Sequence, residues 1–373
     1  MNLFIYGTLR SPRLAEAVAG RLMEPVPARL DGFEVWTVAG EITPLICPDA
    51  GGVTEGAVWL DVPDDVLSRL DLYDGAFGYR LVPVTIRTAN GATLDAQVYL
   101  PPDDLKAGDS PWSFDDWSRF ESFSVHAAEE VFHHAPPHTA ETLRQSWPQI
   151  QKRAWSFAQA QGAAPPASEI RYDPEDGDLT ITEADPIRGQ FFGFQSFSVR
   201  HRTFQNQRSE VLTREVFIGM EAVMVLPYDA KRDAVLLVEQ ARMGPAVRGD
   251  RNPWTLEPVA GMVDALEDPT EAARREMVEE TGMQVGDLTR MTSFYASPGS
   301  TTDYFHAYLG TCDLPDIDSW TGGLDSENED LRLHVLPFAK AMDLIETGEI
   351  DVGPLVLMLY WLARNRDRLR ARA

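Results

Sequence analysis

The stretch "GMVDALEDPTEAARREMVEETGM", residues 261–283, decides the fold of the C-terminal half of the chain. Its second part predicts a helix with well-defined ends. Asp268 is a good N-cap, Pro269 suits the first helical position, and Glu271 falls where the acid of a capping box would stand. Gly282 is typical of the residue that stops a helix. We therefore expect a short, rigid helix between these two ends.

This predicted helix gathers acidic side chains on one face. Glu276, Glu279 and Glu280 stand at positions i, i+3 and i+4, which are neighbours on a helix surface, and like charges placed so repel one another. Ala273 and Met277 form a separate apolar stripe. Such a carboxylate cluster either raises the pKa of one carboxyl group or binds a hard divalent cation such as Mg²⁺. The cluster thus predicts a metal site.

Composition narrows the classes of function. The 373 residues exceed one ordinary domain, so two or three domains are expected. With 33 basic and 58 acidic side chains the net charge is −25, which argues against nucleic-acid binding. Cysteine occurs twice, too rarely for a disulfide framework, and no apolar run is long enough for a membrane span. Since the N-terminus also lacks the pattern of a signal peptide, we expect a cytoplasmic protein without a membrane partner.

The pattern along the chain changes near residues 111 and 165. Residues 1–100 hold short β-rich runs at 2–7, 33–38, 55–62, 79–88 and 93–100, with a short helix predicted over 64–75. Residues 112–160 are helical in pattern and broken at "HHAPPH", and "AQAQGAAPPASE", residues 158–169, is typical of a linker. Residues 222–242 predict a hairpin of buried strands. The expected domains are therefore 1–111, a helical connector and linker at 112–168, and 169–373.

The opening stretch resembles the Nudix box: glycine, five residues, glutamate, seven residues, then Arg-Glu-apolar-x-Glu-Glu-x-Gly-apolar. The fixed positions are filled by Gly261, Glu267, Arg275, Glu276, Glu279, Glu280 and Gly282. The stretches "LLVEQARMGP", "PWTLEPVAG", "YASPGSTTD" and the one from "GGLDSENED" onward are similar to signatures of the ADP-ribose pyrophosphatase branch of the Nudix hydrolases, from about residue 197 to the C-terminus. The resemblance implies an α/β/α sandwich.

The same resemblance implies roles for individual residues. The metal ligands would be the carbonyl of Ala260 and the side chains of Glu276, Glu279, Glu280 and Glu329. Glu327, in the loop "SENED", would be the general base and would share catalysis with Glu280. Arg242, Ser297 and Gly299 would bind substrate. Asp303 stands where the family often has glutamate, so it receives no role.

The implied reaction is hydrolysis of a pyrophosphate, which needs neutralised phosphoryl oxygens and a deprotonated water. Mg²⁺ is the expected cofactor, with Mn²⁺ as a possible substitute. A nucleoside diphosphate sugar is the expected substrate, with ADP-ribose favoured over ADP-glucose, GDP-mannose and NADH. Enzymes of this branch form dimers that share the site, so the resemblance also implies a homodimer.

The N-terminal part carries a second resemblance. "FIYGTLR", "TEGAVWLDV" and "LDLYDGAFGYR" are together similar to the gamma-glutamylcyclotransferase-like (AIG2-like) family, over about residues 1–102. This implies a β-barrel with helices and a pocket formed by Tyr6, Gly7, Thr8, Leu9 and Asp74. Asp74 replaces the glutamate that serves the family as acid and base, and this shortens the side chain by one methylene. Bacterial proteins associated with tellurite resistance resemble the same two-part fusion.

Three hypotheses therefore remain open from the sequence. The first is a Nudix hydrolase, the second a gamma-glutamyl cyclotransferase acting through its N-terminal pocket, and the third a binding protein that holds a nucleotide sugar without turnover. The complete set of carboxylates in residues 261–283 favours the first.

Overall fold

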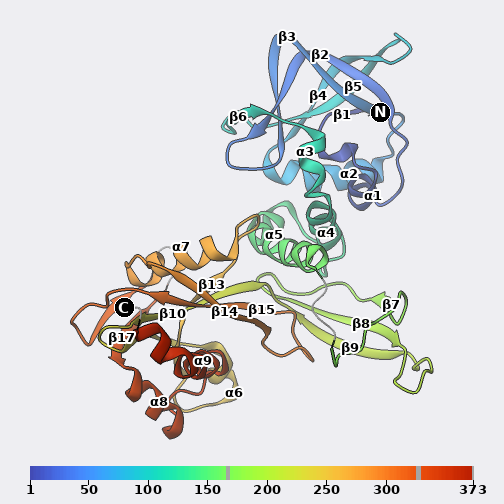
Figure 1. Ribbon diagram of the computed structural model, residues 1–373. Coiled ribbons are helices and arrows are strands. Elements are labelled where there is room, and N and C mark those ends of the chain that lie inside the picture. Colours follow the sequence, from blue (N-terminus) through green and yellow to red (C-terminus); the bar gives the residue numbers. More distant parts are fainter. Residues whose placement is uncertain (165–168, 325–328, 372–373) are drawn as a thin grey trace. The chain divides into compact units, whose positions relative to one another are not determined.

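A computed structural model describes residues 1–164, 169–324 and 329–371 (Figure 1). The chain divides into two compact units, Met1–Glu215 and Val216–Ala373, and each is described here by itself. The narrower domain limits expected from the sequence remain predictions.

The first unit begins with a closed β-barrel. Its strands are β1 (Leu3–Ile5), β2 (Val26–Val38), β3 (Pro44–Trp59), β4 (Arg80–Thr88) and β5 (Thr93–Leu100), with β6 (Ala107–Pro111) added beside β2. The strand order is β3-β1-β5-β4-β2, and pairing of β3 with β2 closes the ring. The predicted N-terminal barrel is therefore confirmed.

Alternation along β1 gives the barrel two apolar sides. Phe4 faces one buried cluster together with Val58 and Ile86, which lines the barrel interior. Leu3 and Ile5 face the other way, against two helices, α1 (Pro12–Ala19) and α2 (Asp64–Tyr73). A strand buried on both sides needs apolar residues at successive positions, as "LFI" provides.

Two strands of the barrel, β2 and β3, are longer than the sequence suggested. The prediction started one strand at Phe33, whereas β2 starts at Val26. The pairing with β3 shifts register between Asp31 and Phe33, and Gly32 there has φ +86°. A glycine that accepts this left-handed conformation makes a bulge, so the strand continues through what resembled a turn.

Helices follow the barrel, and a small sheet completes the first unit. The helices are α3 (Phe114–Ser118), α4 (Glu121–Phe132) and α5 (Ala140–Gly162), with the predicted break between α4 and α5. The predicted linker was wrong at its start, because α5 extends through residues 158–162, where alanine and glutamine favour a helix. The sheet consists of β7 (Leu179–Ala184), β8 (Gly193–His201) and β9 (Leu212–Ile218), the last of which runs into the second unit.

The second unit is built on one mixed sheet. Its strands are β10 (Glu221–Asp229), β11 (Ala234–Ala241), β12 (Trp254–Glu257), β13 (Val259–Met262), β14 (Leu288–Tyr295), β15 (Tyr304–Thr311), β16 (Ser319–Gly322) and β17 (Leu331–Pro337). Its helices are α6 (Met243–Arg248), α7 (Pro269–Thr281), α8 (Phe338–Thr347) and α9 (Gly353–Arg370). The strand order is β14-β15-β10-β11-β17-β16, with β12 on β11 and β13 on β10.

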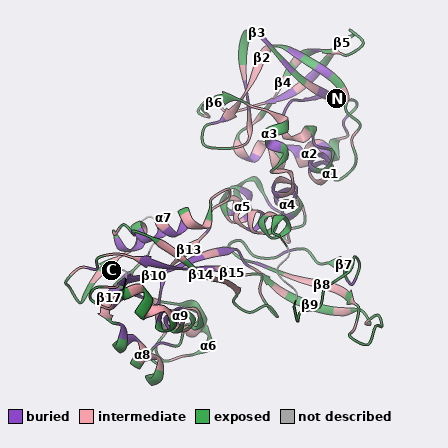
Figure 2. Cartoon of the chain, viewed as in Figure 1, coloured by how far each residue is buried: buried purple, intermediate pink, exposed green. Residues whose placement is uncertain are grey.

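Helices cover both faces of this sheet. The predicted hairpin is confirmed, since β10 and β11 pair antiparallel through Tyr228 and Val235. Leu226 and Leu237 pack against α8 and α9, while α7 lies over the opposite face (Figure 1). Figure 2 shows buried residues along the central strands and on the inner side of α7. The expected α/β/α sandwich is thereby confirmed.

Among the described residues, no helix combines the length and apolarity needed to cross a membrane.

Candidate active site in the second unit

The helix α7 has the predicted ends. The side chain of Asp268 accepts a hydrogen bond from the Thr270 N–H at 2.7 Å, and Pro269 occupies the first turn. Gly282 ends the helix with φ +70°. The predicted separation of faces was wrong, because Glu276 and Glu280 are buried along with Ala273 and Met277 on the inner side. Carboxylates therefore lie where a helix normally carries apolar side chains.

Arg275 holds the acidic residues of this region together. Its guanidinium donates hydrogen bonds to both carboxylate oxygens of Glu267, each at 2.9 Å. Its Nη1 also donates to Glu276 at 2.6 Å and to Glu279 at 2.8 Å, and its Nη2 to the Met262 carbonyl at 3.0 Å. These carboxylates raise the pKa of Arg275, so it is a permanent cation that orients them.

Strand β13 approaches Glu276 so closely that it needs a glycine at residue 261. A Cβ atom added to Gly261 would lie 1.9 Å from the carboxyl carbon of Glu276. Gly261 is also held in place by its pairing with Val223 of β10. The carboxylate of Glu276 thus rests against bare backbone, which explains this position of the sequence pattern.

Glu280 is the most unusual titratable group of the site. It is 2% exposed, and its Oε2 atom has no hydrogen-bond partner among the residues that the structure describes. Burial raises the pKa of its carboxyl to about 9, and the charges of Glu276 and Glu329 act in the same direction. The backbone N–H of Ala260 partly offsets this rise. A bound cation would stabilise the ionised form of this buried carboxyl beside the two other carboxylates.

Glu329, which precedes β17, is the third carboxylate of the site. Its carboxylate accepts a hydrogen bond from the Leu324 N–H at 3.2 Å. Gly323, with φ +95°, donates its N–H to the Glu280 carbonyl at 3.0 Å and brings this segment against α7. Glu327, the predicted general base, lies outside the described residues.

The donor set fits a hard divalent cation. Glu276, Glu280 and Glu329 are electrostatically coupled oxygen donors, and the unpartnered oxygen of Glu280 is a buried acceptor that needs a positive partner. Within residues 1–164, 169–324 and 329–371, however, no three His, Cys, Asp or Glu side chains are grouped so that they could hold an ion as they stand. Glu276 instead accepts from Arg275, so its carboxylate would have to turn toward an ion.

Arg242, a predicted substrate residue, is held from one side. Its Nε and Nη2 atoms donate to the two oxygens of Glu257 at 2.8 Å and 2.6 Å. Glu257 raises the pKa of Arg242, with smaller contributions from Glu280 and Glu329. The guanidinium therefore lies within the electrostatic range of the acidic cluster. Sequence reasoning missed Glu257, although it stands inside the quoted signature "PWTLEPVAG".

The other two predicted substrate residues lie on the exposed loop between β14 and β15. The Ser297 hydroxyl pairs with that of Ser300 at 3.0 Å, and the Ser300 carbonyl accepts from the Phe217 N–H. Gly299 lies in the turn between them. Asp303 packs against Gly219, where an added Cβ would meet its carboxylate at 1.6 Å. The loop is thus tied to the end of β9.

In the first unit two of the predicted pocket residues, Tyr6 and Asp74, lie close enough to interact electrostatically. Burial raises the pKa of Asp74 to about 7, and the neighbouring charge of Asp71 acts in the same direction. The pKa of Tyr6 is raised by burial, and Asp74 is among the charges that add to this. Tyr99, which sequence reasoning missed, donates to Asp71 at 2.5 Å. An acid that titrates near neutrality suits proton transfer.

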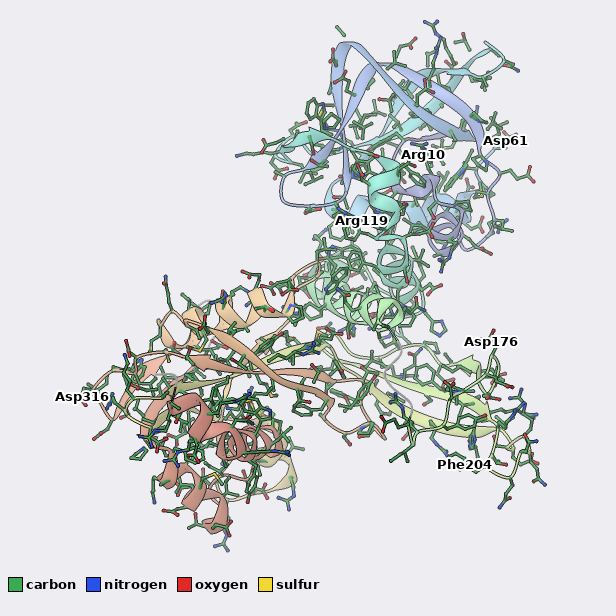
Figure 3. The ribbon with its side chains drawn as sticks, viewed as in Figure 1. Arg10, Asp61, Arg119, Asp176, Phe204 and Asp316 are labelled. Carbon is green, nitrogen blue, oxygen red and sulfur yellow. The ribbon has the colours of Figure 1, made fainter. Side chains whose placement is uncertain are left out.

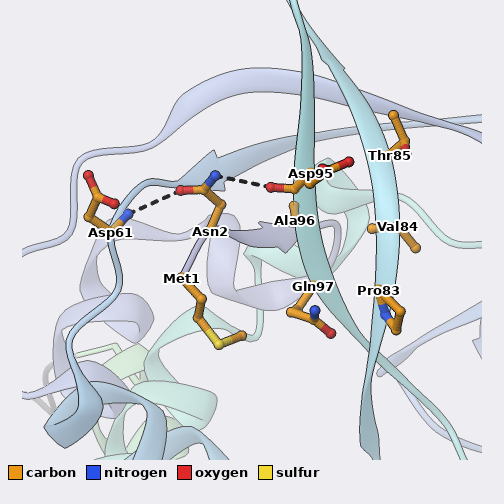
Figure 4. Close-up of a pocket in the computed structure, with 9 residues that line it drawn as sticks. All are labelled: Met1, Asn2, Asp61, Pro83, Val84, Thr85, Asp95, Ala96 and Gln97. Atoms are coloured by element: carbon orange, nitrogen blue, oxygen red, sulfur yellow. Dashed lines mark hydrogen bonds between the residues drawn. The ribbon is translucent and has the colours of Figure 1, made fainter.

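The turn after β1 is closely packed. Thr8 begins a short 3₁₀ helix, Thr8–Arg10, which also contains Leu9, and the Arg10 N–H donates to the Gly7 carbonyl at 3.1 Å. A Cβ on Gly7 would lie 2.4 Å from Pro44. A separate cavity of about 550 Å³ lies near Asn2, at the start of β1 rather than its end (Figure 4).

Replacing Asp74 by asparagine is expected to stabilise the protein in a pH-dependent way. Since the folded-state pKa lies above the usual 3.8, the contribution of Asp74 to stability is fully present below about pH 4 and is lost as the pH rises through about 7. Asparagine does not ionise, so Asp74→Asn should raise the free energy of unfolding by about 4 kcal/mol at pH 8. At pH 4 it should change little. Thermal unfolding of both proteins at the two pH values measures this, and an equal shift at both would contradict it.

Comparisons with known proteins agree with this division. Residues 220–356 match the NUDIX domain, and residues 3–119 match the gamma-glutamyl cyclotransferase, AIG2-like family. The chain is 37% identical over 205 residues to an ADP-ribose pyrophosphatase of Haemophilus influenzae, covering 54% of this chain and 94% of that one. It is 37% identical over 193 residues to the ADP-ribose pyrophosphatase of Escherichia coli K12, covering 52% and 91%. It is 34% identical over 180 residues to a GDP-mannose pyrophosphatase of Escherichia coli SMS-3-5, covering 47% and 93%.

With its sandwich fold and its glutamate-rich helix, the chain belongs to the Nudix hydrolases. More particularly, the curated relatives that match its C-terminal half include ADP-ribose pyrophosphatases at 37% identity and a GDP-mannose pyrophosphatase at 34%, and an AIG2-like domain precedes that half. Nudix hydrolases generally depend on a divalent metal.

Proposed function

We propose that the protein hydrolyses the pyrophosphate of ADP-ribose, giving AMP and ribose 5-phosphate, with Mg²⁺ as its metal. The observation that carries the proposal is Glu280, a buried carboxyl with an unpartnered oxygen beside the charges of Glu276 and Glu329. The names of the two ADP-ribose pyrophosphatases, each 37% identical to this chain, support the choice of substrate.

Each part of the site has a task in this reaction. Glu276, Glu279, Glu280, Glu329 and the Ala260 carbonyl would hold Mg²⁺, or Mn²⁺ in its place. The metal, when bound, would neutralise charge on the phosphoryl oxygens and acidify a water. Arg275 fixes the direction of the carboxylates, and Arg242 would bind a phosphate, with Ser297 and Gly299 on the same substrate. Glu327, from the sequence, would take the proton of the attacking water.

The test is product release from four compounds, with and without Mg²⁺. ADP-ribose should give AMP and ribose 5-phosphate when Mg²⁺ is present, faster than ADP-glucose, GDP-mannose or NADH is cleaved, and no product should form with EDTA. A preference for GDP-mannose, which the name of one relative brings into the panel, would refute the substrate while keeping the reaction class. Cleavage that persists in EDTA would refute the metal.

A second candidate function rests on Asp74. Its buried carboxyl, with a pKa near 7, stands in a domain that matches the cyclotransferase family, and it could exchange a proton with an amine that attacks a gamma-glutamyl carbonyl. The test is metal-independent release of 5-oxoproline from gamma-glutamyl peptides, lost in Asp74→Asn. No release from the wild type would leave this domain a binding module.

We also propose a homodimer. The small sheet of β7, β8 and β9 exposes apolar side chains: Leu179 is 66% exposed, Ile181 58% and Phe204 95%. Figure 3 shows Phe204 on the segment between β8 and β9. A second copy covering these side chains would remove an unfavourable apolar surface. Sedimentation analysis should give about twice the mass of one chain.

Domain limits at residues 111 and 168 and a cytoplasmic location are also proposed, on the basis of the sequence.

A further inference from the structure

A buried glutamate stands on the strand next to the acidic cluster. Glu257 ends β12 and is 8% exposed. It is neither one of the expected metal ligands nor one of the expected catalytic residues. Its two oxygens accept from Nε and Nη2 of Arg242. Burying a carboxylate is costly unless it is paired and hydrogen-bonded, so its place needs a reason.

A third group locks this pair. The Thr255 hydroxyl donates to the Oε1 atom of Glu257 at 2.6 Å. Thr255 and Glu257 are two residues apart on one strand and therefore point to the same side of it. Thr255 is 7% exposed. Both residues are also fixed by pairing of β12 with β11, through Gln240 and Val238. The carboxylate thus has a set direction before Arg242 meets it.

Arg242 itself is held at two levels. Its backbone N–H donates to the Pro253 carbonyl at 2.9 Å, and its guanidinium meets Glu257 through one edge, Nε and Nη2. The other edge, Nη1, carries two further N–H groups, and the side chain is 44% exposed. The charges of Glu280 and Glu329 reach the guanidinium. The Nε and Nη2 edge is therefore fixed by Glu257, while the Nη1 edge can still donate hydrogen bonds next to the acidic cluster.

We propose that Glu257, fixed by Thr255, is a positioning residue that aims the Nη1 edge of Arg242 at a phosphate of the substrate. This inference deepens the proposed function and rests on it. A free arginine side chain would lose rotamer entropy on binding a phosphate, whereas one already held by a carboxylate has lost it during folding. Glu257 would therefore act on substrate affinity through Arg242 and would not touch the substrate.

A purely structural ion pair elsewhere in this unit serves as the matched control. Asp233, at the other end of β11, pairs with Nε and Nη2 of Arg366 and accepts from the Tyr228 hydroxyl. The arrangement resembles that of Glu257, with an arginine fork and a hydroxyl on one carboxylate, although the Asp233 side chain is 16% exposed. Asp233→Asn should lower the melting temperature and leave KM and kcat unchanged.

The test is a double-mutant cycle on the full chain. Glu257→Gln should raise the KM for ADP-ribose about tenfold with kcat within about threefold, because an amide cannot accept from both guanidinium nitrogens. Thr255→Val should raise KM less, and Thr255→Ser should restore it. In an Arg242→Ala background, which itself raises KM, Glu257→Gln should have almost no further effect.

Either of two kinetic results would overturn the inference. One is a full effect of Glu257→Gln in the Arg242→Ala background, and the other is a fall in kcat at constant KM, since either means that Glu257 acts by itself. If the wild type does not hydrolyse ADP-ribose, the proposed function is refuted but this inference is not. The same four proteins are then compared by their dissociation constants for inorganic pyrophosphate, measured by calorimetry. Failure of the wild type to bind pyrophosphate, or undiminished binding by Arg242→Ala, overturns the inference too.

Discussion

Glu280→Gln is expected to lower kcat for ADP-ribose hydrolysis by about a thousandfold or more, equal to ~4 kcal/mol of transition-state stabilisation. Glutamine has the shape of glutamate but brings no negative charge to a cation. Glu280 is 2% exposed, and within residues 1–164, 169–324 and 329–371 its Oε2 atom has no hydrogen-bond partner. The lost charge therefore weakens binding of the cation that the site holds. The fold should persist, since the substitution keeps the volume and replaces a carboxyl whose ionisation burial already disfavours.

Two measurements check this expectation. Steady-state rates of AMP release should fall in Glu280→Gln but not in Glu271→Gln, an exposed glutamate in the first turn of the same helix. Mg²⁺ should raise the melting temperature of the wild type and of Glu271→Gln, and should not raise that of Glu280→Gln, because a ligand stabilises only a protein that binds it. Normal turnover in Glu280→Gln would remove this residue from the reaction.

Local patterns in the sequence predicted the parts of this site that depend on neighbours in the chain. The N-cap at Asp268, the end of α7 at Gly282 and the hairpin of β10 and β11 depend on contacts between residues a few positions apart. Residue type is enough to predict these because capping and turn formation are local. The barrel and the sandwich were also within reach of pattern and resemblance.

Contacts between distant segments were beyond such reasoning. The sequence placed Glu276 and Glu280 on a face apart from Met277, yet all three are buried, because β13 and the segment at Gly323 close over the helix. The same holds for Glu257, which is 15 positions from the arginine that it holds. Neither burial nor pairing across strands shows in helical spacing, and both decide the electrostatics of the site.

The first unit gives a parallel case. Asp74 was expected in a pocket, but its raised pKa depends on burial and on Asp71, three positions earlier. Tyr99 of β5 donates to Asp71 of α2, 28 positions away in sequence. A substitution of glutamate by aspartate, seen alone, indicates a shorter reach. In the folded protein, the burial of Asp74 and the nearby charge of Asp71 also make its ionised form unfavourable at neutral pH.

Gly261→Ala should lower kcat/KM by about a hundredfold although the change adds a single methyl group, since a displacement of about 1 Å at a catalytic group can cost that much. The new Cβ would lie 1.9 Å from the carboxyl carbon of Glu276. Gly261 is paired with Val223, so the strand resists moving, and the carboxylate must leave. Its bond from Arg275 at 2.6 Å would break with it. Overpacking should also reduce the free energy of unfolding by about 1–3 kcal/mol.

Gly353→Ala separates this effect from the general cost of adding a methyl group. Gly353 begins α9, and an added Cβ there meets no atom of the described residues within 4 Å, so stability and rate should stay at wild-type values. Kinetics and thermal unfolding of the two variants, with Mg²⁺ titrated in each, decide the matter. Gly261→Ala should need more Mg²⁺ for half-maximal rate, because Glu276 no longer lies where the metal is expected. An unchanged Mg²⁺ requirement with full activity would mean that Glu276 is not a ligand, and that its contact with Gly261 serves packing alone.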